Sequence, residues 1–333
     1  MEKYNKGLIS DSVFLSMFRL RKFGFDTSFA EIESFLPRKL CIFLRRYINV
    51  YAINFFVFFE IVKSDIVIHI NSFFAQFIFA IFFPQKPKWV LYDYSLTGLM
   101  GNAKTIKQKL LKSIISRSKG IIVISEEERL RLSKAFPGLK ENIVFIRYGI
   151  DTNFFSPIDV KEEDYILSIG HDMWRDYKTL FEAVRGLNIK LIITDSKRAK
   201  KMQNMPDFVQ VLNFTDEELR LAYAKAKLIV IPLDITGGFN DAMGCSTLVE
   251  AFSMGKPVIV TRTFTTESYV EDGHNALFVE KGNAKEMKDK IQYLLNDNEA
   301  RKILGSNARK YAVEKCDAEI VATETMSFLK KIM

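Results

Sequence analysis

The fold is decided by residues 244–273, GCSTLVEAFSMGKPVIVTRTFTTESYVEDG, where turn residues, hydrophobic spacing and a carboxylate occur together. Leu248 and Phe252 are one helical turn apart, so a helix over this stretch turns both side chains toward a core. Gly255 suits the left-handed position after a helix, and the apolar residues 258–260 indicate a buried strand. The stretch therefore predicts a loop, a short helix with a hydroxyl cap, and a strand.

Glu250 is the carboxylate of that helix, and it allows two interpretations. It lies about 60° around the helix from Thr247 and away from the core, which brings it close to the N-terminal amides. The pair matches the S/T-x-x-E capping box, which needs no ligand. Alternatively, the helix amides bind a diphosphate and the carboxylate binds ribose hydroxyls, as in a nucleotide site.

The composition is that of a globular protein with room for two domains: 333 residues, of which 48% are apolar and 26% charged. Three cysteines far apart, without a C-x-x-C pair, argue against a disulfide framework and a structural zinc site. Only three histidines are present, so a histidine-based metal site is not expected. The composition thus predicts a reducing environment and no bound metal.

The net charge of +8 is unevenly distributed, because residues 1–150 hold 23 Lys and Arg against 12 Asp and Glu. That excess suits an anionic partner. No nucleic-acid motif accompanies it, and 17 of the 29 Phe fall within the first 100 residues. We therefore expect an anionic membrane surface rather than nucleic acid, with the basic segment 38–46 as the candidate contact. The start of the chain lacks the pattern of a signal peptide, which predicts a cytoplasmic protein, peripheral on the inner face of the cell membrane.

Short apolar strands alternate with amphipathic helices, which predicts an α/β fold with parallel sheets. Residues 66–85 carry no charge, but polar residues interrupt them, so a strand and a helix over 73–83 are expected rather than a membrane span. Ser125 and Thr215 each precede acidic residues and predict helix N-caps. The expected strands cover 66–70, 89–92, 120–124, 143–146, 165–170, 190–195, 209–212, 228–231, 258–260 and 276–279.

The segment LVEAFSMGKPVIV, followed by Glu267 and EDGHNALFV, resembles the donor-binding segment of the retaining glycosyltransferases of the family-four type, the glycosyl transferases group 1. Motifs in matching order extend over about residues 120–330. The resemblance implies the GT-B fold: an α/β protein of two facing Rossmann-like domains with a deep interdomain cleft. It also implies an acceptor domain over 1–150, a donor domain over 151–315 and a C-terminal helix over 316–333 that crosses back to the first domain.

The resemblance implies a site as well. Glu250 matches the glutamate that binds the ribose of the sugar nucleotide, while Ala242 stands where a second glutamate is usual and Asp241 lies beside it. Arg175 fills the basic position of the phosphate site, although a flexible surface arginine is the plainer interpretation. In the family the corresponding strand ends in a histidine near the donor sugar, and by its spacing from Pro87 that position here is Tyr94. Asp93 or Tyr94 could replace the histidine in function, although an aspartate that closes a strand also suits a turn. The predicted catalytic residues are Asp93, Tyr94 and Arg175, and the predicted donor-binding residues are Arg175, Lys178, Gly244, Ser246, Thr247, Leu248, Glu250, His171 and Asp241.

The function implied is that of a hexosyltransferase. It would move a hexose from a nucleoside-diphosphate sugar to a saccharide or lipid-linked acceptor with retention, in the synthesis of cell-surface polysaccharide or glycan. No metal or other cofactor is expected, because Arg175 and the helix amides would offset the charge of the leaving diphosphate. Two alternatives stay open. The displaced carboxylate and His171 favour a non-catalytic partner subunit of the same architecture, and a nucleotide-sugar epimerase would share the fold but need acid and base groups that this chain offers sparingly.

Overall fold

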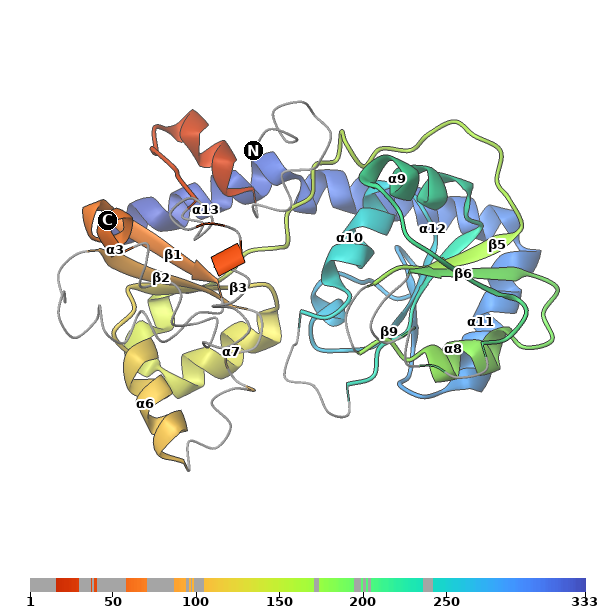
Figure 1. The fold of residues 1–333 in the computed structure, drawn as a ribbon, viewed down its shortest axis with the longest axis horizontal. Coiled ribbons are helices and arrows are strands. Elements are labelled where there is room, and N and C mark those ends of the chain that lie inside the picture. Colours follow the sequence, from red (N-terminus) through yellow and green to blue (C-terminus); the bar gives the residue numbers. More distant parts are fainter. Residues whose placement is uncertain are drawn as a thin grey trace. The chain divides into compact units, whose positions relative to one another are not determined.

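The computed structural model consists of two units, each built on a parallel sheet (Figure 1). Among the described residues, unit 1 contains 16–19 and Arg147–Thr323, and unit 2 contains Leu20–Ile146 and Glu324–Met333. The sequence placed the first boundary after residue 150. The structure describes residues 16–29, 37, 39–40, 58–70, 87–93, 96, 98, 105–170, 174–194, 199, 202, 205–235 and 242–333.

Unit 2 has a four-stranded sheet in the order β1-β2-β3-β4. Its strands are β1 (Ile66–Ile70), β2 (Lys88–Asp93), β3 (Gly120–Val123) and β4 (Ile143–Phe145), and its helical segments include α3 (Phe58–Lys63), α6 (Ile106–Ile115), α7 (Glu126–Ala135) and the 3-10 helix η5 (Pro137–Asn142). Every residue of β3 is buried, as expected of a central parallel strand. Ile115 of α6 and Leu132 of α7 share one core with Ile121 of β3. Both helices therefore cover the same face of the sheet.

Helix α7 begins as the sequence predicted. The Ser125 side chain accepts a hydrogen bond from the Glu128 amide at 3.1 Å, and three glutamates occupy the first turn, where they complement the helix dipole. Another predicted cap, that of Thr215, is a complete capping box with Glu218. Both predicted N-caps are confirmed, because each rests on local spacing alone.

Unit 1 has a six-stranded parallel sheet in the order β10-β9-β8-β5-β6-β7. Counted within the unit and read from β7, that order is 3-2-1-4-5-6, the doubly wound arrangement of a Rossmann-like domain. The direction of winding changes between β5 and β8, and such switch points are where open α/β sheets bind ligands. The strands are β5 (Tyr165–Ser168), β6 (Lys190–Thr194), β7 (Val209–Leu212), β8 (Leu228–Ile231), β9 (Val258–Thr261) and β10 (Leu277–Val279).

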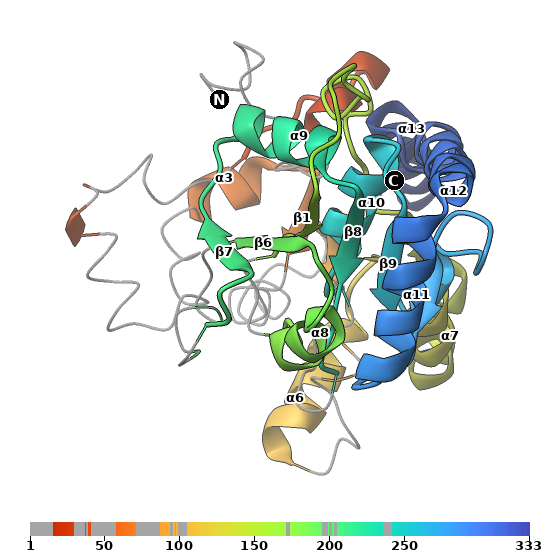
Figure 2. The same cartoon turned by 90° about the vertical axis from the view of Figure 1, so that its right-hand side faces the viewer.

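Helices flank this sheet on both faces (Figure 2). Tyr177 and Leu180 of α8 and Ile291 of α11 are buried in one core with strand residues such as Val230. Helix α10 contacts the strands β8 and β9 and the helix α12, and a hydrogen bond between Tyr223 and Glu250 joins it to α9. The helical segments are α8 (Tyr177–Val184), α9 (Asp216–Lys225), α10 (Cys245–Ser253), η7 (Thr266–Ser268), α11 (Ala284–Asn296), α12 (Asn298–Tyr311) and the π-helical turn η8 (Ala312–Cys316).

The last helix, α13 (Ala318–Ile332), contributes to both units. Its residues up to Thr323 group with unit 1, and those from Glu324 onward group with unit 2. Within unit 2 the ring of Phe328 lies so close to Gly120 that a Cβ at that glycine would be 2.3 Å from it. Lys331 Nζ donates to the Glu141 carbonyl at 2.5 Å. The end of the chain therefore completes the packing of unit 2.

The α/β class is confirmed, with one parallel sheet in each unit. All ten predicted strands are present, with ends that differ by at most two residues. The predicted helix over 73–83 and most of the basic segment 38–46 lie outside the described residues. A 3-10 helix, η2 (Met17–Phe23), is also present near the start of the described chain. None of the helices in the described ranges has the length and apolar character needed to cross a bilayer.

Candidate functional site

The start of α10 differs from the prediction. Gly244 is the N-cap residue, in the left-handed conformation at φ 76°, and no side-chain hydrogen bond caps this end among the described residues. The predicted hydroxyl cap and the capping box of Thr247 with Glu250 are therefore wrong. The physical reason is that a glycine readily adopts a positive φ, which lets the helix begin at Cys245. Thr247 and Glu250 then fall in the first two turns, where their side chains reach neighbouring elements.

The core face of α10 is as predicted, since Leu248 and Phe252 are both fully buried. The Leu248 amide donates to the Gly244 carbonyl at 2.9 Å, so it is engaged within the helix. An α-helix leaves its first N–H groups without an intrahelical acceptor. The amides of Ser246 and Thr247 are thus the ones that the first turn can present to an anion.

Arg175 lies in the loop between β5 and α8, and its side chain is buried, at 1% exposure. Its Nη2 donates to Thr247 Oγ1 at 3.1 Å. Its backbone forms a β-bridge with Leu233, just after β8. The plainer interpretation of Arg175 as a flexible surface arginine is therefore wrong: the guanidinium is fixed beside the N-terminal turn of α10.

The guanidinium of Arg175 occupies space that is open because two neighbouring residues are glycines without a side chain. A Cβ at Gly170, where φ is 151°, would lie 2.0 Å from Arg175 Nε, and a Cβ at Gly244 would lie 3.3 Å from Nη1. Thr194 Oγ1 accepts from the Gly170 amide and donates to the Gly170 carbonyl, both at 2.9 Å, which fixes the turn. The sequence gave no sign that an arginine would lie against Gly170.

Glu250 receives a hydrogen bond from α9: the Tyr223 hydroxyl donates to Glu250 Oε2 at 2.9 Å. Tyr223 is fully buried, whereas part of Glu250 reaches solvent. Burial raises the pKa of the Glu250 carboxyl to about 7, the Tyr223 hydrogen bond and the Arg175 charge oppose that rise, and Asp216 adds to it. Burial, and then the charge of Glu250, raise the pKa of the Tyr223 hydroxyl well above its ordinary value. The carboxyl therefore changes charge near neutral pH, while Tyr223 remains a donor.

Tyr223 is the residue of this site that the sequence did not reveal. A buried tyrosine hydroxyl needs a partner, and Tyr223 lies on the buried stripe of α9, so the sequence did carry a sign that a partner exists. It carried no sign that the partner is Glu250, 27 residues away.

The site is thus a cluster of four side chains, Arg175, Tyr223, Thr247 and Glu250, which we call the α10 cluster. Glu250 lies in the second turn of α10 and Tyr223 near the end of α9, whereas Arg175 and Thr247 follow the carboxyl ends of β5 and β8. Because this is the switch point of the unit 1 sheet, the cluster lies where a ligand is expected in such a fold. It combines a positive charge, helix amides and a carboxylate.

The other predicted site residues are not part of this cluster. Lys178 is exposed on α8 and forms no hydrogen bond or ion pair with the described part of the chain. Asp93 belongs to unit 2, where it is buried at the end of β2 and its Oδ2 accepts from the Leu96 amide at 2.5 Å. This is the turn role that the sequence also allowed. Tyr94, His171 and Asp241 lie outside the described residues.

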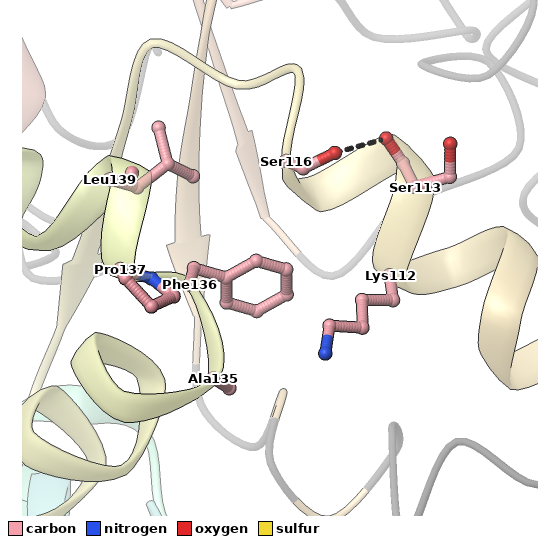
Figure 3. A pocket seen from close by; sticks show the side chains of 8 residues that line it. Lys112, Ser113, Ser116, Ala135, Phe136, Pro137 and Leu139 are labelled. Carbon is pink, nitrogen blue, oxygen red and sulfur yellow. Dashed lines mark hydrogen bonds between the residues drawn. The ribbon is translucent and has the colours of Figure 1, made fainter.

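A pocket of about 360 Å³ lies in unit 2, between the end of α6 and the segment that joins α7 to η5 (Figure 3). Lys112 Nζ is 5.9 Å from the centre of the Phe136 ring, and Ser116 donates to the Ser113 carbonyl. It is lined by Lys112, Ser113, Ser116, Ala135, Phe136, Pro137, Gly138 and Leu139. Among these described lining residues Lys112 is the one with an ionisable side chain, so they provide no acid and base pair. Within the described ranges, no three His, Cys, Asp or Glu side chains gather as metal ligands would.

Comparison with known proteins agrees with this geometry. The family model described as "Glycosyl transferases group 1" matches residues 149–311, which include the whole α10 cluster. An uncharacterized glycosyltransferase, MJ1178, of Methanocaldococcus jannaschii is 33% identical over 151 residues, 41% of this chain and 40% of that protein. The capsular polysaccharide biosynthesis glycosyltransferase CapM of Staphylococcus aureus is 22% identical over 72% of this chain and 63% of its own length. The chain thus spans less than two thirds of either relative.

Among solved structures, Anabaena Alr3699/HepE in complex with UDP and glucose has a TM-score of 0.69 at 16% identity. The superposition covers 84% of this chain and 81% of that one. At this level of identity the likeness concerns the fold, and it supports the predicted GT-B arrangement of two Rossmann-like domains.

Proposed function

We propose, from the premise that this chain belongs to the group 1 glycosyl transferases, that it moves a hexose from a nucleoside-diphosphate sugar to a saccharide or lipid-linked acceptor. One observation carries the proposal. Arg175 and Glu250 are 75 residues apart in the sequence. Arg175 bonds to Thr247 in the first turn of α10, Glu250 lies in the second turn, and the helix begins at the switch point of the sheet. A nucleoside diphosphate needs positive charge for its phosphates and an acceptor for its ribose hydroxyls, and this cluster supplies both.

The ribose would bind at Glu250. Tyr223 donates to Oε2, so Oε1 can accept from a ribose hydroxyl. A hydrogen bond to a charged carboxylate contributes about 1.5–3 kcal/mol, more than one between neutral groups. Because the pKa of Glu250 is raised to about 7, we expect this contact to weaken as the pH falls below neutral and the carboxyl takes up a proton.

The diphosphate would bind at the start of α10. The amides of Ser246 and Thr247 point along the helix axis toward the anion, where the helix dipole is positive. Arg175 is fixed beside them by Thr247. Two unit charges 4 Å apart attract by roughly 4 kcal/mol at an effective dielectric constant of about 20, before the cost of desolvation. The guanidinium can therefore stabilise a diphosphate without leaving its buried position.

The reaction would proceed by departure of the nucleoside diphosphate, with retention at the sugar carbon. The charge that builds on the leaving group is offset by Arg175 and the helix amides, which are in place before the bond breaks, as electrostatic catalysis requires. No metal ion takes part in the mechanism that we propose, and no other cofactor. Asp93 and Tyr94 stay our candidates for groups of unit 2 that contact the sugar.

The acceptor and the location also belong to the proposal. CapM acts in capsular polysaccharide biosynthesis, which favours a role of this chain in cell-surface polysaccharide or glycan synthesis. Unit 2 would rest on an anionic membrane at the cytoplasmic face. Helix α6 supports this, because it exposes Ile106, at 87%, and Leu110, at 43%, next to the exposed Lys109 and Lys112. Exposed apolar side chains flanked by lysines suit the boundary between headgroups and water.

The test is incubation of the full chain with a panel of nucleoside-diphosphate hexoses and saccharide acceptors, scored for transfer, hydrolysis and conversion of the sugar. Transfer with retained configuration supports the proposal. Conversion of one nucleotide sugar into its epimer, without transfer, would support the epimerase alternative. Binding without any turnover would support the non-catalytic partner subunit.

A further inference from the structure

We propose that Tyr223 is a positioning residue: its buried hydroxyl fixes the Glu250 carboxylate so that the second carboxylate oxygen meets the ribose of the donor. The inference rests on the proposed function, in which Glu250 binds that ribose. It adds a residue from α9, which neither the family resemblance nor the sequence pattern singled out.

The first argument is geometric. The Tyr223 side chain is fully buried, and its hydroxyl lies 2.9 Å from Glu250 Oε2. The helix that carries it is fixed at its start by the capping box of Thr215 and Glu218. The donor therefore has little freedom of its own.

The second argument concerns what the carboxylate would do without this donor. Glu250 is partly exposed, and a glutamate side chain has several freely rotating bonds. The hydrogen bond from a fixed tyrosine selects one orientation before the ligand arrives, and such preorganisation improves affinity by reducing what must be ordered on binding. Because the tyrosine hydroxyl bonds to Oε2, Oε1 is the oxygen left to accept a hydrogen bond from the ribose.

A structural role is the competing explanation, since a buried tyrosine hydroxyl needs some acceptor. The two explanations differ in their dependence on pH. Within the described part of the chain, the charged or titratable groups that act on Glu250 are Tyr223 and Asp216 from α9 and Arg175 from the loop after β5. Burial raises the pKa of Glu250, and the Tyr223 hydrogen bond lowers it. Removing the hydroxyl therefore raises that pKa further, so that the ribose contact is lost at a higher pH than in the wild type.

The experiment compares Tyr223→Phe with Tyr165→Phe. Both changes remove one buried hydroxyl from unit 1, but the Tyr165 hydroxyl bonds to the Ala222 carbonyl rather than to Glu250. UDP, GDP and ADP are titrated calorimetrically into the full chain. The affinity of the tightest binder is then measured from pH 6 to 9. Inorganic pyrophosphate serves as the control ligand without ribose. Ratios of variant to wild-type affinity at each pH cancel the titration of the ligand itself.

We expect Tyr223→Phe to lower nucleoside-diphosphate affinity about threefold to tenfold at pH 7 and to leave pyrophosphate affinity unchanged. The midpoint of its pH profile should move upward, and Tyr165→Phe should match the wild type in both respects. In the Glu250→Gln background, Tyr223→Phe should have no further effect. If Tyr223→Phe does not fold, 3,5-difluorotyrosine at position 223 keeps the shape and makes a more acidic donor, which should move the midpoint downward.

The outcomes separate the two proposals. If Glu250→Gln lowers nucleotide affinity but Tyr223→Phe and the fluorinated residue behave as the wild type, Tyr223 is merely structural and the inference is overturned. If Glu250→Gln itself binds nucleoside diphosphates as the wild type does, the donor site proposed for this chain is wrong, whatever Tyr223 does.

Discussion

Arg175 Nη2 donates to Thr247 Oγ1 at 3.1 Å, and this hydrogen bond joins the loop after β5 to the first turn of α10 across 72 residues of sequence. The arginine is buried at 1% exposure, so its position is set by the protein and not by a ligand. A charge held in this way is ready before the substrate binds, which is the condition for electrostatic stabilisation of a leaving group.

Replacing Arg175 with alanine should weaken binding of a nucleoside diphosphate about tenfold to a hundredfold, and leave binding of the nucleoside nearly unchanged. The reason is that only the diphosphate carries the charge that the guanidinium meets. The measurement is calorimetric titration with both ligands. Arg301→Ala is the control, because Arg301 is also buried but bonds to the carbonyl of Leu294. Equal loss of both ligands in Arg175→Ala would argue for a purely structural arginine.

Gly170→Ala should disturb the site through Arg175. The new Cβ would lie 2.0 Å from Arg175 Nε, and the backbone is held at φ 151°. We expect the guanidinium to move, diphosphate affinity to drop, and the free energy of unfolding to fall by about 1–3 kcal/mol. Gly186→Ala is matched, since that glycine also has a positive φ, of 80°, but its Cβ would meet only Lys288 Nζ at 3.9 Å. It should lose stability and keep its affinity. Wild-type affinity in a folded Gly170→Ala variant would contradict the close contact.

Glu250→Gln should change how stability depends on pH. Burial raises the pKa of this carboxyl from 4.5 to about 7, so the native wild type keeps a proton that the unfolded chain releases between those values. The free energy of unfolding of the wild type therefore falls as the pH rises through this window. The glutamine carries no such proton, so the variant should gain on the order of 1–3 kcal/mol relative to the wild type between pH 5 and pH 8. Denaturant titrations at both pH values measure the difference.

Glu286→Gln is the control of opposite sign. Burial acts against ionisation there, but Lys290 and the Glu280 amide hold the pKa of Glu286 below its ordinary value. Ionised Glu286 therefore stabilises the fold above that range, and Glu286→Gln should be less stable than the wild type at pH 8. This deficit should shrink as the pH falls. The same trend in both variants would show that something other than these carboxyls governs the pH dependence.

Reversing the charge of Lys109 and Lys112 should reduce sedimentation of the full chain with anionic vesicles at low salt. Each lysine near such a surface contributes on the order of 1 kcal/mol, and the effect fades within a Debye length. Lys285 and Lys302, exposed on α11 and α12 of unit 1, are the control pair. Equal sedimentation of the wild type with anionic and neutral vesicles would remove the membrane proposal altogether.

Transfer activity should survive a chelator such as EDTA, because in the proposed mechanism Arg175 and the α10 amides take the role that a divalent cation has where carboxylates bind the diphosphate. The measurement is the initial rate with and without chelator, followed by addition of Mg²⁺ or Mn²⁺. Loss of activity that either ion restores would count decisively against the proposed mechanism.

What the sequence could predict depended on whether the determining contacts are local. The caps of α7 and α9 follow from spacings of three residues, so Ser125 and Thr215 were recognisable. The capping box of Thr247 and Glu250 has the same spacing and does not form. The left-handed Gly244 starts the helix earlier, and Arg175 and Tyr223 then engage the two side chains. Those partners come from other elements, and no local pattern encodes them.

The division of α13 between the two units has a practical consequence for exchanging unit 2 between related chains. Unit 2 is not a continuous piece of chain, since Phe328 and Lys331 pack onto residues of the first half such as Gly120 and Glu141. A chimaera that exchanges only the N-terminal half would combine a foreign sheet with the native C-terminal end. Phe328 would then pack against whatever residue the foreign sheet has at the position of Gly120. Exchanging unit 2 as a whole therefore calls for three crossovers, one between Arg19 and Leu20, one near Arg147 and one after Thr323.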